Sequence, residues 1–158
     1  KMKTYNILSI QEFKTIIGDN SRLLGIDPGK TNVGIAICDE NKKVATPIKI
    51  IKKNKLVSLV DEINKIINDN HIKGIVIGNP INMDGSVGKS SKSALEFAKN
   101  LSKNIRIPIV LWDERLSSAG AFKITSFLED NVTNRVKNLD KNAAAFILQG
   151  AIDYLNIN

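Results

Sequence analysis

Four acidic side chains stand directly after or before apolar segments of this sequence. Asp27 follows the apolar run LLGI and precedes a Pro-Gly turn, whereas Asp113 and Glu114 follow the run IPIVLW, and Asp140 opens a later apolar segment. Carboxylates that share one site repel each other unless a cation lies between them, and oxygen ligands without His or Cys favour Mg²⁺ or Mn²⁺. We therefore predict a Mg²⁺ or Mn²⁺ site with Asp27, Glu114 and Asp140 as ligands and with Asp113 as a further catalytic acid.

Two such cations can hold a phosphodiester, generate a hydroxide and stabilise the leaving oxygen, so the acids indicate metal-dependent phosphodiester cleavage. Each acid also has a simpler interpretation. Asp27 fits the first position of an Asp-Pro-Gly turn, and Asp140 fits a helix N-terminus. Asp113 and Glu114, with Arg115 after them, fit a solvated charge cluster. Convergence of the acids in the fold is what distinguishes a metal site from these alternatives.

Basic residues near the acids are candidates for binding substrate phosphates. The Gly-rich loop 78–91 follows an apolar strand and leads into a helix, so its amides and Lys89 can hold a phosphate at the helix N-terminus. The alternative is an ordinary connecting loop, although its fourteen residues make it long for one. Arg115 directly follows the acid pair and can grip a phosphate through two parallel hydrogen bonds; alternatively, it pairs with Asp113.

Hydrophobic periodicity predicts the elements that position these residues. The predicted strands are 23–27, 33–38, 44–51, 73–80 and 107–114, and the predicted helices are 55–70, 89–104, 116–129 and 141–155. The first three strands can form a meander, and helices and strands then alternate. This order predicts one α/β domain with a mixed five-stranded sheet and helices on both faces. The first and fifth strands end in acids, and ligands of open α/β sheets bind beyond the carboxyl ends of the strands.

Residues 1–22 precede this pattern, and we predict that they form an N-terminal extension to a nuclease domain at 23–158. Ser9 and Glu12 have the spacing of a capping box, and Gly18 is placed to end a short helix. We therefore expect one short helix within the extension.

The composition favours a nucleic-acid partner. The chain has 158 residues, with 23 Lys and Arg against 16 Asp and Glu and a formal charge of +7, and basic proteins attract polyanions. A genome biased towards Lys, Asn and Ile is the alternative explanation. A single His argues against Ser/His/Asp catalysis and His-rich zinc sites, and a single Cys fits a reducing compartment. Because no run of 18 apolar residues and no signal-peptide core is present, we expect a soluble, cytoplasmic protein with no membrane partner.

Lysines gather between the second predicted strand and the first long helix, with no acid among them. They are Lys42, Lys43, Lys49, Lys52, Lys53 and Lys55. One hypothesis is that they contact phosphates. The alternative is that they protect an edge strand from pairing with other chains.

Four stretches of the sequence resemble, in order, the four motifs of the YqgF/RuvX family, which is described as Holliday-junction-resolvase-like or as a pre-16S rRNA nuclease. They are GIDPGKTNVGIAI, IVIGNPINMDGS, WDERLSS and LDKNAAAFILQ, and the similarity covers residues 23 to about 155. The first motif is also similar to the start of RuvC resolvases, whereas NMDG and DERLS are specific to YqgF. The resemblance implies an RNase H-like fold, and it maps the family's acids onto Asp27, Glu114 with Asp113 beside it, and Asp140.

The resemblance also bears on substrate binding. The family has a basic residue two positions after the glycine of the first motif, where this chain has Thr31, with Lys30 one position earlier. We expect Lys30 and Thr31, Asn82 in the second motif, Lys89 and Arg115 to contact substrate.

Three functions are consistent with these features. The first is a Mg²⁺- or Mn²⁺-dependent nuclease that matures the 5′ end of pre-16S rRNA, with pre-rRNA and the small ribosomal subunit as partners, acting as a monomer or homodimer. The second is a Holliday junction resolvase acting on branched DNA, which needs two paired active sites and therefore argues against a strict monomer. The third is a non-catalytic RNA-binding assembly factor, which would bind RNA without cleaving it in the presence of any metal.

Overall fold

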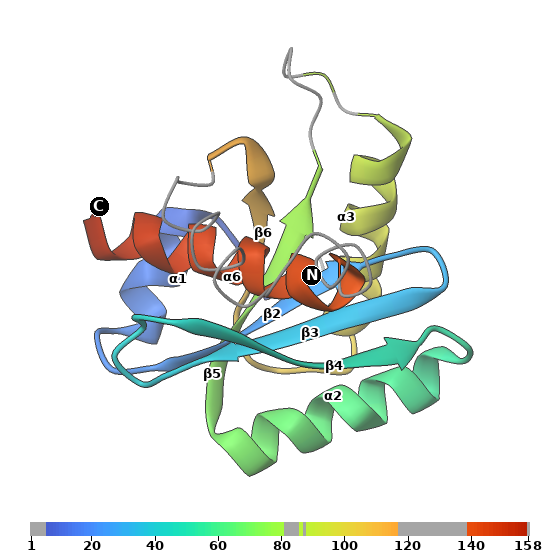
Figure 1. The fold of residues 1–158 in the computed structure, drawn as a ribbon, viewed down its shortest axis with the longest axis horizontal. Helices are drawn as coiled ribbons and strands as arrows, with labels where there is room; N and C mark the ends of the chain where they lie inside the picture. Colours follow the sequence, from blue (N-terminus) through green and yellow to red (C-terminus); the bar gives the residue numbers. More distant parts are fainter. Residues whose placement is uncertain (1–5, 81–85, 87, 117–138, 158) are drawn as a thin grey trace, which may run out of the picture.

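The computed structural model describes residues 6–80, 86, 88–116 and 139–157. In this part of the chain, a short strand and a short helix precede a three-stranded meander, after which helices and strands alternate (Figure 1). The strands are β1 (Ile7–Leu8), β2 (Arg22–Pro28), β3 (Asn32–Cys38), β4 (Ala45–Lys52), β5 (Ile72–Asn79) and β6 (Ile109–Asp113). The helices are α1 (Ile10–Ile17), α2 (Leu56–Asn70), α3 (Lys89–Ser102), the 3₁₀ helix η1 (Glu114–Leu116) and α6 (Leu139–Ile157). The predicted helix 116–129 lies outside the described residues, apart from its first residue.

The strands form one mixed sheet in the order β1-β6-β5-β2-β3-β4. The four strands β1, β6, β5 and β2 run parallel, whereas β3 is antiparallel to both β2 and β4. The predicted meander is therefore β2-β3-β4, and the prediction of a mixed α/β sheet is confirmed. The sheet has six strands where the sequence predicted five, because β1 adds a strand beside β6.

The additional strand β1 belongs to the segment predicted as an N-terminal extension. It has only two residues, too few to show the alternation by which strands are recognised in a sequence. Side-chain hydrogen bonds hold it in place: Asn6 donates through its Nδ2 to the carbonyl oxygens of Ile105, at 2.8 Å, and Ile107. The N-terminal segment is thus tied directly to the chain that leads into β6.

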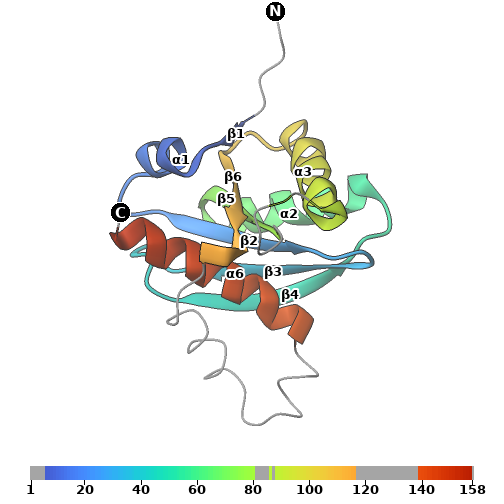
Figure 2. The same cartoon turned by 90° about the horizontal axis from the view of Figure 1, so that it is seen from above.

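Helices cover both faces of the sheet. Helices α2 and α3 pack on one face around Ile75 and Ile77 of β5, whereas α1 and α6 pack on the other around Val76. Figure 2 shows α3 and α6 on opposite sides of the sheet. The alternation along β5 explains its continuous apolar sequence, since a strand buried on both faces has no polar side.

Helix α1 packs tightly on the sheet. Ser9 and Glu12 form the predicted capping box, and the helix ends at Gly18, whose φ of 74° lies in the left-handed region. Phe13 is fully buried. A Cβ at Gly74 of β5 would lie 2.7 Å from Cζ of Phe13, so the absence of a side chain at Gly74 is what lets the ring approach the strand.

Helix α6 lies across β2, β3 and β4 (Figure 1) and is held there by a buried amide. Gln149 is 2% exposed. Its Oε1 accepts from the Ala45 backbone N–H at 2.8 Å, and its Nε2 donates to the Lys43 carbonyl and to Oδ1 of Asp153, both at 2.9 Å. Gln149 therefore joins α6 to the start of β4. Among the described helices, none combines the length and the apolar character needed to cross a membrane.

The Gln149→Met substitution tests this anchor. Methionine keeps most of the side-chain volume but leaves the buried Ala45 N–H without an acceptor, and an unsatisfied buried group costs about 1–3 kcal/mol. We expect the free energy of unfolding, measured by urea denaturation, to fall by about 2 kcal/mol. The matched control is Gln11→Met on the exposed side of α1, which should be nearly neutral. Equal stability of the Gln149→Met variant and the parent would contradict this role.

Candidate active site

Two of the predicted acids converge at the carboxyl ends of parallel strands. Strands β2 and β6 lie on either side of β5. Asp27 lies near the end of β2, one residue beyond the Ile26–Ile77 pair, and Asp113 ends β6 and pairs in register with Asn79. Glu114 follows at the start of η1. The order of the strands thus places both acids beside the last residues of β5, as the sequence predicted.

Gly78 of β5 makes room for the Glu114 carboxylate. A Cβ at this position would lie 2.8 Å from Oε2 of Glu114 and 2.5 Å from Cδ1 of Ile147 on α6. Both distances are shorter than real carbon contacts allow, so a side chain at Gly78 would displace one neighbour or the other. The glycine therefore lets Glu114 fold back over β5 towards Asp27.

The two acids at the carboxyl end of β6 have opposite electrostatic surroundings. Burial raises the pKa of Glu114, and the charges of Asp27 and Asp113 raise it further. Asp113, by contrast, has its pKa lowered by the side-chain hydrogen bonds of Arg115. Because the folded-state pKa of Glu114 is raised, this group favours folding most at low pH, and its contribution is lost as pH rises through that pKa.

Arg115 forms an ion pair with Asp113 and leaves Glu114 to face Asp27. Its Nη2 lies 2.7 Å from Oδ2 of Asp113, and its Nε donates to both Asp113 oxygens at 3.0 and 3.1 Å. This is the pairing that the sequence left as the alternative to a phosphate contact. Asp113 is therefore the member of the acid pair that Arg115 neutralises, whereas Glu114 has its pKa raised by burial and by the neighbouring acids.

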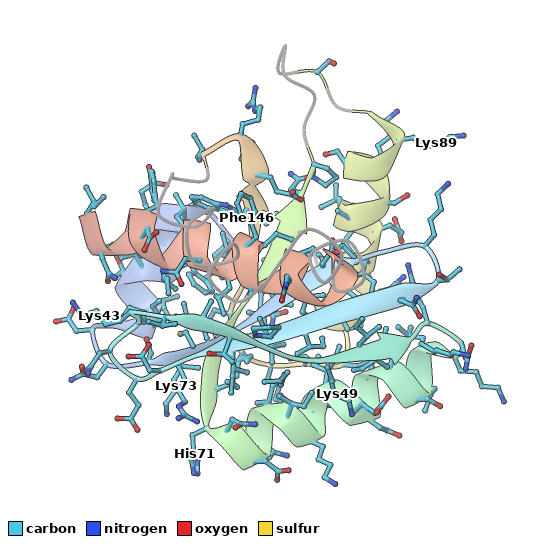
Figure 3. All side chains as sticks on the ribbon, viewed as in Figure 1. Lys43, Lys49, His71, Lys73, Lys89 and Phe146 are labelled. Carbon is cyan, nitrogen blue, oxygen red and sulfur yellow. The ribbon has the colours of Figure 1, made fainter. Side chains whose placement is uncertain are left out.

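A cavity of about 570 Å³ opens in front of the carboxylates of Asp27 and Glu114. Asp27 and Glu114 line it, together with three lysines from separate segments: Lys30 after β2, Lys53 after β4 and Lys89 at the start of α3. Figure 3 shows Lys89 at the N-terminal end of α3. A negative centre with a positive surround can hold a divalent cation and a phosphate group at the same time.

The other residues predicted to bind substrate differ in their position relative to this cavity. Lys30 and Lys89 line the cavity, whereas Thr31 is not among its lining residues and contributes its carbonyl oxygen to the Lys53 N–H. Asn82 lies outside the described residues. Lys53 was predicted only as one of the lysine run, because nothing in its local sequence indicates that β4 ends beside the turn after β2.

The donor set suits a hard divalent cation. Asp27 and Glu114 supply carboxylate oxygens, and the raised pKa of Glu114 reflects burial and repulsion that a cation would offset. Within residues 6–80, 86, 88–116 and 139–157, no group of three or more His, Cys, Asp or Glu side chains is arranged to hold a metal. The third predicted ligand, Asp140, lies in the first turn of α6, and its side chain is outside the described part of the structure.

Comparison with known proteins identifies the family. The model of the RuvX family, described as Holliday junction resolvase, matches residues 21–154.

The chain belongs to the RuvX family.

The predicted YqgF/RuvX resemblance is thereby confirmed. A RuvX relative from Pelagibacter ubique (strain HTCC1062) is 51% identical over 150 residues, which cover 95% of this chain and 99% of the relative. Another, from Ruegeria pomeroyi (strain ATCC 700808 / DSM 15171 / DSS-3), is 39% identical over 149 residues, which cover 93% of this chain and 96% of the relative. Both are named "Putative pre-16S rRNA nuclease".

Solved structures confirm the predicted RNase H-like fold of this RuvX chain. RuvC of T. thermophilus in complex with Holliday junction substrate superposes with a TM-score of 0.53 at 12% identity, covering 87% of this chain and 96% of RuvC. A second solved structure, of Thermus thermophilus RuvC, gives a TM-score of 0.50 at 11% identity. The match covers 86% of this chain and 96% of that chain. At such identities the similarity establishes the fold alone.

The Glu114→Gln substitution tests the metal site without relying on activity. In the presence of a chelator we expect a melting temperature equal to or above that of the parent, because the variant removes a half-buried carboxylate that Asp27 repels. Mn²⁺ should stabilise the parent by about 2.7 kcal/mol at a hundred times its dissociation constant, and the variant should lose this stabilisation.

The measurement is thermal unfolding in titrations of Mn²⁺ and Mg²⁺. Glu40→Gln is the matched control, since Glu40 is an exposed acid in the turn between β3 and β4. The control should respond to Mn²⁺ as the parent does. Equal Mn²⁺ stabilisation of Glu114→Gln and the parent would remove Glu114 from the metal site.

Proposed function

We propose that this protein is a Mg²⁺- or Mn²⁺-dependent nuclease that cleaves phosphodiester bonds in the maturation of pre-16S rRNA. It acts in the cytoplasm, with the small ribosomal subunit as a partner. The observation that carries the proposal is the convergence of Asp27 and Glu114 on either side of Gly78, facing a cavity lined by lysines. The names of the RuvX relatives, which describe a pre-16S rRNA nuclease, supply the substrate.

The acids and the lysines have separate tasks in this proposal. Asp27 and Glu114, with Asp140 as the third expected ligand, would hold the metal, which supplies a water of lowered pKa and offsets the charge that develops on the phosphate. Lys30, Lys53 and Lys89 lie around the same cavity and bind the phosphates of the substrate.

Asp113 and Arg115 have a positioning role in this proposal. Their ion pair fixes the start of η1, and Glu114 lies between them in the sequence. The ion pair therefore orients the segment that carries Glu114, and it keeps the arginine from neutralising Glu114 itself.

Substrate recognition rests on the sugar-phosphate backbone. Of the described aromatic side chains, Phe13, Phe97 and Trp112 are buried, and Phe146 is half-buried. Tyr154 is also half-buried and packs edge-on against Trp112 with ring centroids 5.4 Å apart. Proteins that bind single strands through stacking present exposed rings to successive bases, and these rings do not offer such a platform. Binding through phosphates and shape fits a nuclease that recognises an RNA end by its context.

A resolvase of branched DNA is the second candidate. It is favoured by the description of the RuvX family model as a Holliday junction resolvase. The two candidates differ in their requirements, since a symmetric junction needs two paired active sites and an RNA end needs only one.

Competition between the two substrates tests the proposed function. A labelled pre-16S rRNA end and a labelled four-way DNA junction are incubated together with the protein, Mn²⁺ and fixed salt. We expect preferential cleavage of the RNA, and we expect Asp27→Asn to reduce the cleavage rate by orders of magnitude because it removes a metal ligand's charge.

Other outcomes of the same experiment would contradict the proposed function. Paired, symmetric nicks in the junction with intact RNA would replace the first candidate by the resolvase. Binding of RNA without cleavage in Mg²⁺ or Mn²⁺ would favour a non-catalytic assembly factor. The mass of the protein in solution, with and without the junction, distinguishes a monomer from a homodimer.

A further inference from the structure

The structure divides the lysine run 42–55 into groups with different tasks. Lys42 is 5% exposed, and its Nζ donates to the backbone carbonyls of Gly18, at 3.2 Å, and Asp19. Lys49 is exposed and lies 3.2 Å from Oε1 of Glu62 on α2. Neither lysine faces the candidate active site, so the run cannot act as one phosphate-binding strip along β4.

The end of the run lines a second cavity beside the active site. This cavity, of about 450 Å³, lies between the segment that joins β4 to α2 and the exposed side of α3. Its polar lining includes Lys30, Lys53, Asn54, Lys55, Ser93 and Asn100, and we call it the flanking groove. Three of these residues, Lys30, Lys53 and Ser93, also line the cavity in front of Asp27 and Glu114. The flanking groove is therefore continuous with the candidate active site.

Lys53 is held in position where the two cavities meet. Its backbone N–H donates to the Thr31 carbonyl at 2.8 Å, which ties the end of β4 to the turn between β2 and β3. Its Nζ lies 5.2 Å from the centroid of the Phe97 ring and 3.5 Å from the Gly29 carbonyl oxygen. A cation over an aromatic face is attracted to it, so the ammonium group of Lys53 is oriented before any ligand binds.

We propose that the flanking groove binds a single polynucleotide strand next to the scissile bond, through its backbone phosphates. This inference rests on the proposed nuclease function, because it assigns the groove the segment of substrate that continues from the active site. Lys53 and Lys55 contact phosphates, and Asn54 and Asn100 offer amide groups to the sugars or base edges. A dispersed set of lysines and amides with no exposed aromatic ring suits recognition of the backbone.

Among the described residues, Glu96 is the one acidic side chain that lines the flanking groove. Its carboxylate would repel a phosphate held by the lysines. The Glu96→Gln substitution should therefore strengthen binding, whereas loss of either groove lysine should weaken it. A change in the net charge of the protein would produce the same two effects. Lysines far from the groove must therefore be substituted as well, to show that the effects come from contacts in the groove.

The test measures binding in a background that does not cleave. The Glu114→Gln protein is titrated with a fluorescent single-stranded RNA and with a DNA of the same sequence, over a series of salt concentrations. Substituting Lys53→Met or Lys55→Met keeps the aliphatic stem and removes the charge. Each lost phosphate contact should reduce the slope of log K against log salt by about 0.7 on a single strand. Equal effects on RNA and DNA are expected if the groove binds phosphates.

Lys43→Met and Lys73→Met are the matched controls. Both lysines are exposed and lie on the opposite side of the molecule from Lys89 (Figure 3), and neither lines the flanking groove. They should leave the salt slope unchanged, and Glu96→Gln should raise the affinity several-fold. Equal loss of slope from the groove lysines and the controls would overturn the inference, as would an unchanged slope in the groove variants.

Failure of this inference can be separated from failure of the proposed function. If the parent protein cleaves RNA but Lys53→Met and Lys55→Met keep the full salt slope, the groove assignment is wrong and the nuclease stands. If the parent binds RNA with the expected slopes but never cleaves it, the groove assignment stands and the nuclease is wrong. A parent protein that binds neither strand contradicts both.

Discussion

Glu114 and Asp27 face each other across a strand that has no side chain at the point where they meet, and most of the site follows from this approach of two like charges. The parallel strands β2 and β6 deliver the acids to the same edge of the sheet, and Gly78 leaves the space between them. Burial and mutual repulsion make the ionised pair unfavourable without a compensating charge. Surrounding charges are arranged accordingly: Arg115 is engaged by Asp113, and three lysines line the cavity at which the two acids lie.

Arg115 shows how a strongly basic protein can keep an acidic centre. A free guanidinium next to Glu114 would neutralise it and compete with a metal ion for its oxygens. Instead, Nε and Nη2 of Arg115 donate to the two carboxylate oxygens of Asp113 in a bidentate pair. Neighbouring acids of the same sequence motif therefore have different tasks: Asp113 balances the arginine, and Glu114 lines the cavity beside Asp27.

Much of this architecture was predictable from local pattern. The apolar runs of β2 and β3 reflect burial on both faces of the sheet, and the three- and four-residue spacing of α2 reflects burial of one helix face. A sequence records both patterns directly. Parallel strands that end in acids then predicted the meeting of Asp27 and Glu114. Features that depend on contacts between distant segments were not predictable in this way: the pairing of β1 with β6, the burial of Lys42 and the place of Lys53 beside the turn after β2.

The sheet also sets an order for folding during synthesis. Asn6 contacts Ser102 across a separation of 96 residues. The strand β1 can therefore pair with β6 only after a much later part of the chain has emerged from the ribosome. The face of β2, β3 and β4 that α6 covers carries the apolar side chains of Ala36, Cys38 and Ala45, and α6 follows all of these strands in the sequence. Nascent chains with such exposed surfaces are prone to aggregate and are typical clients of chaperones. The sheet is therefore covered on this face only after α6 has been synthesised, and a chain stalled before α6 would have an uncovered apolar face beside an unfinished site.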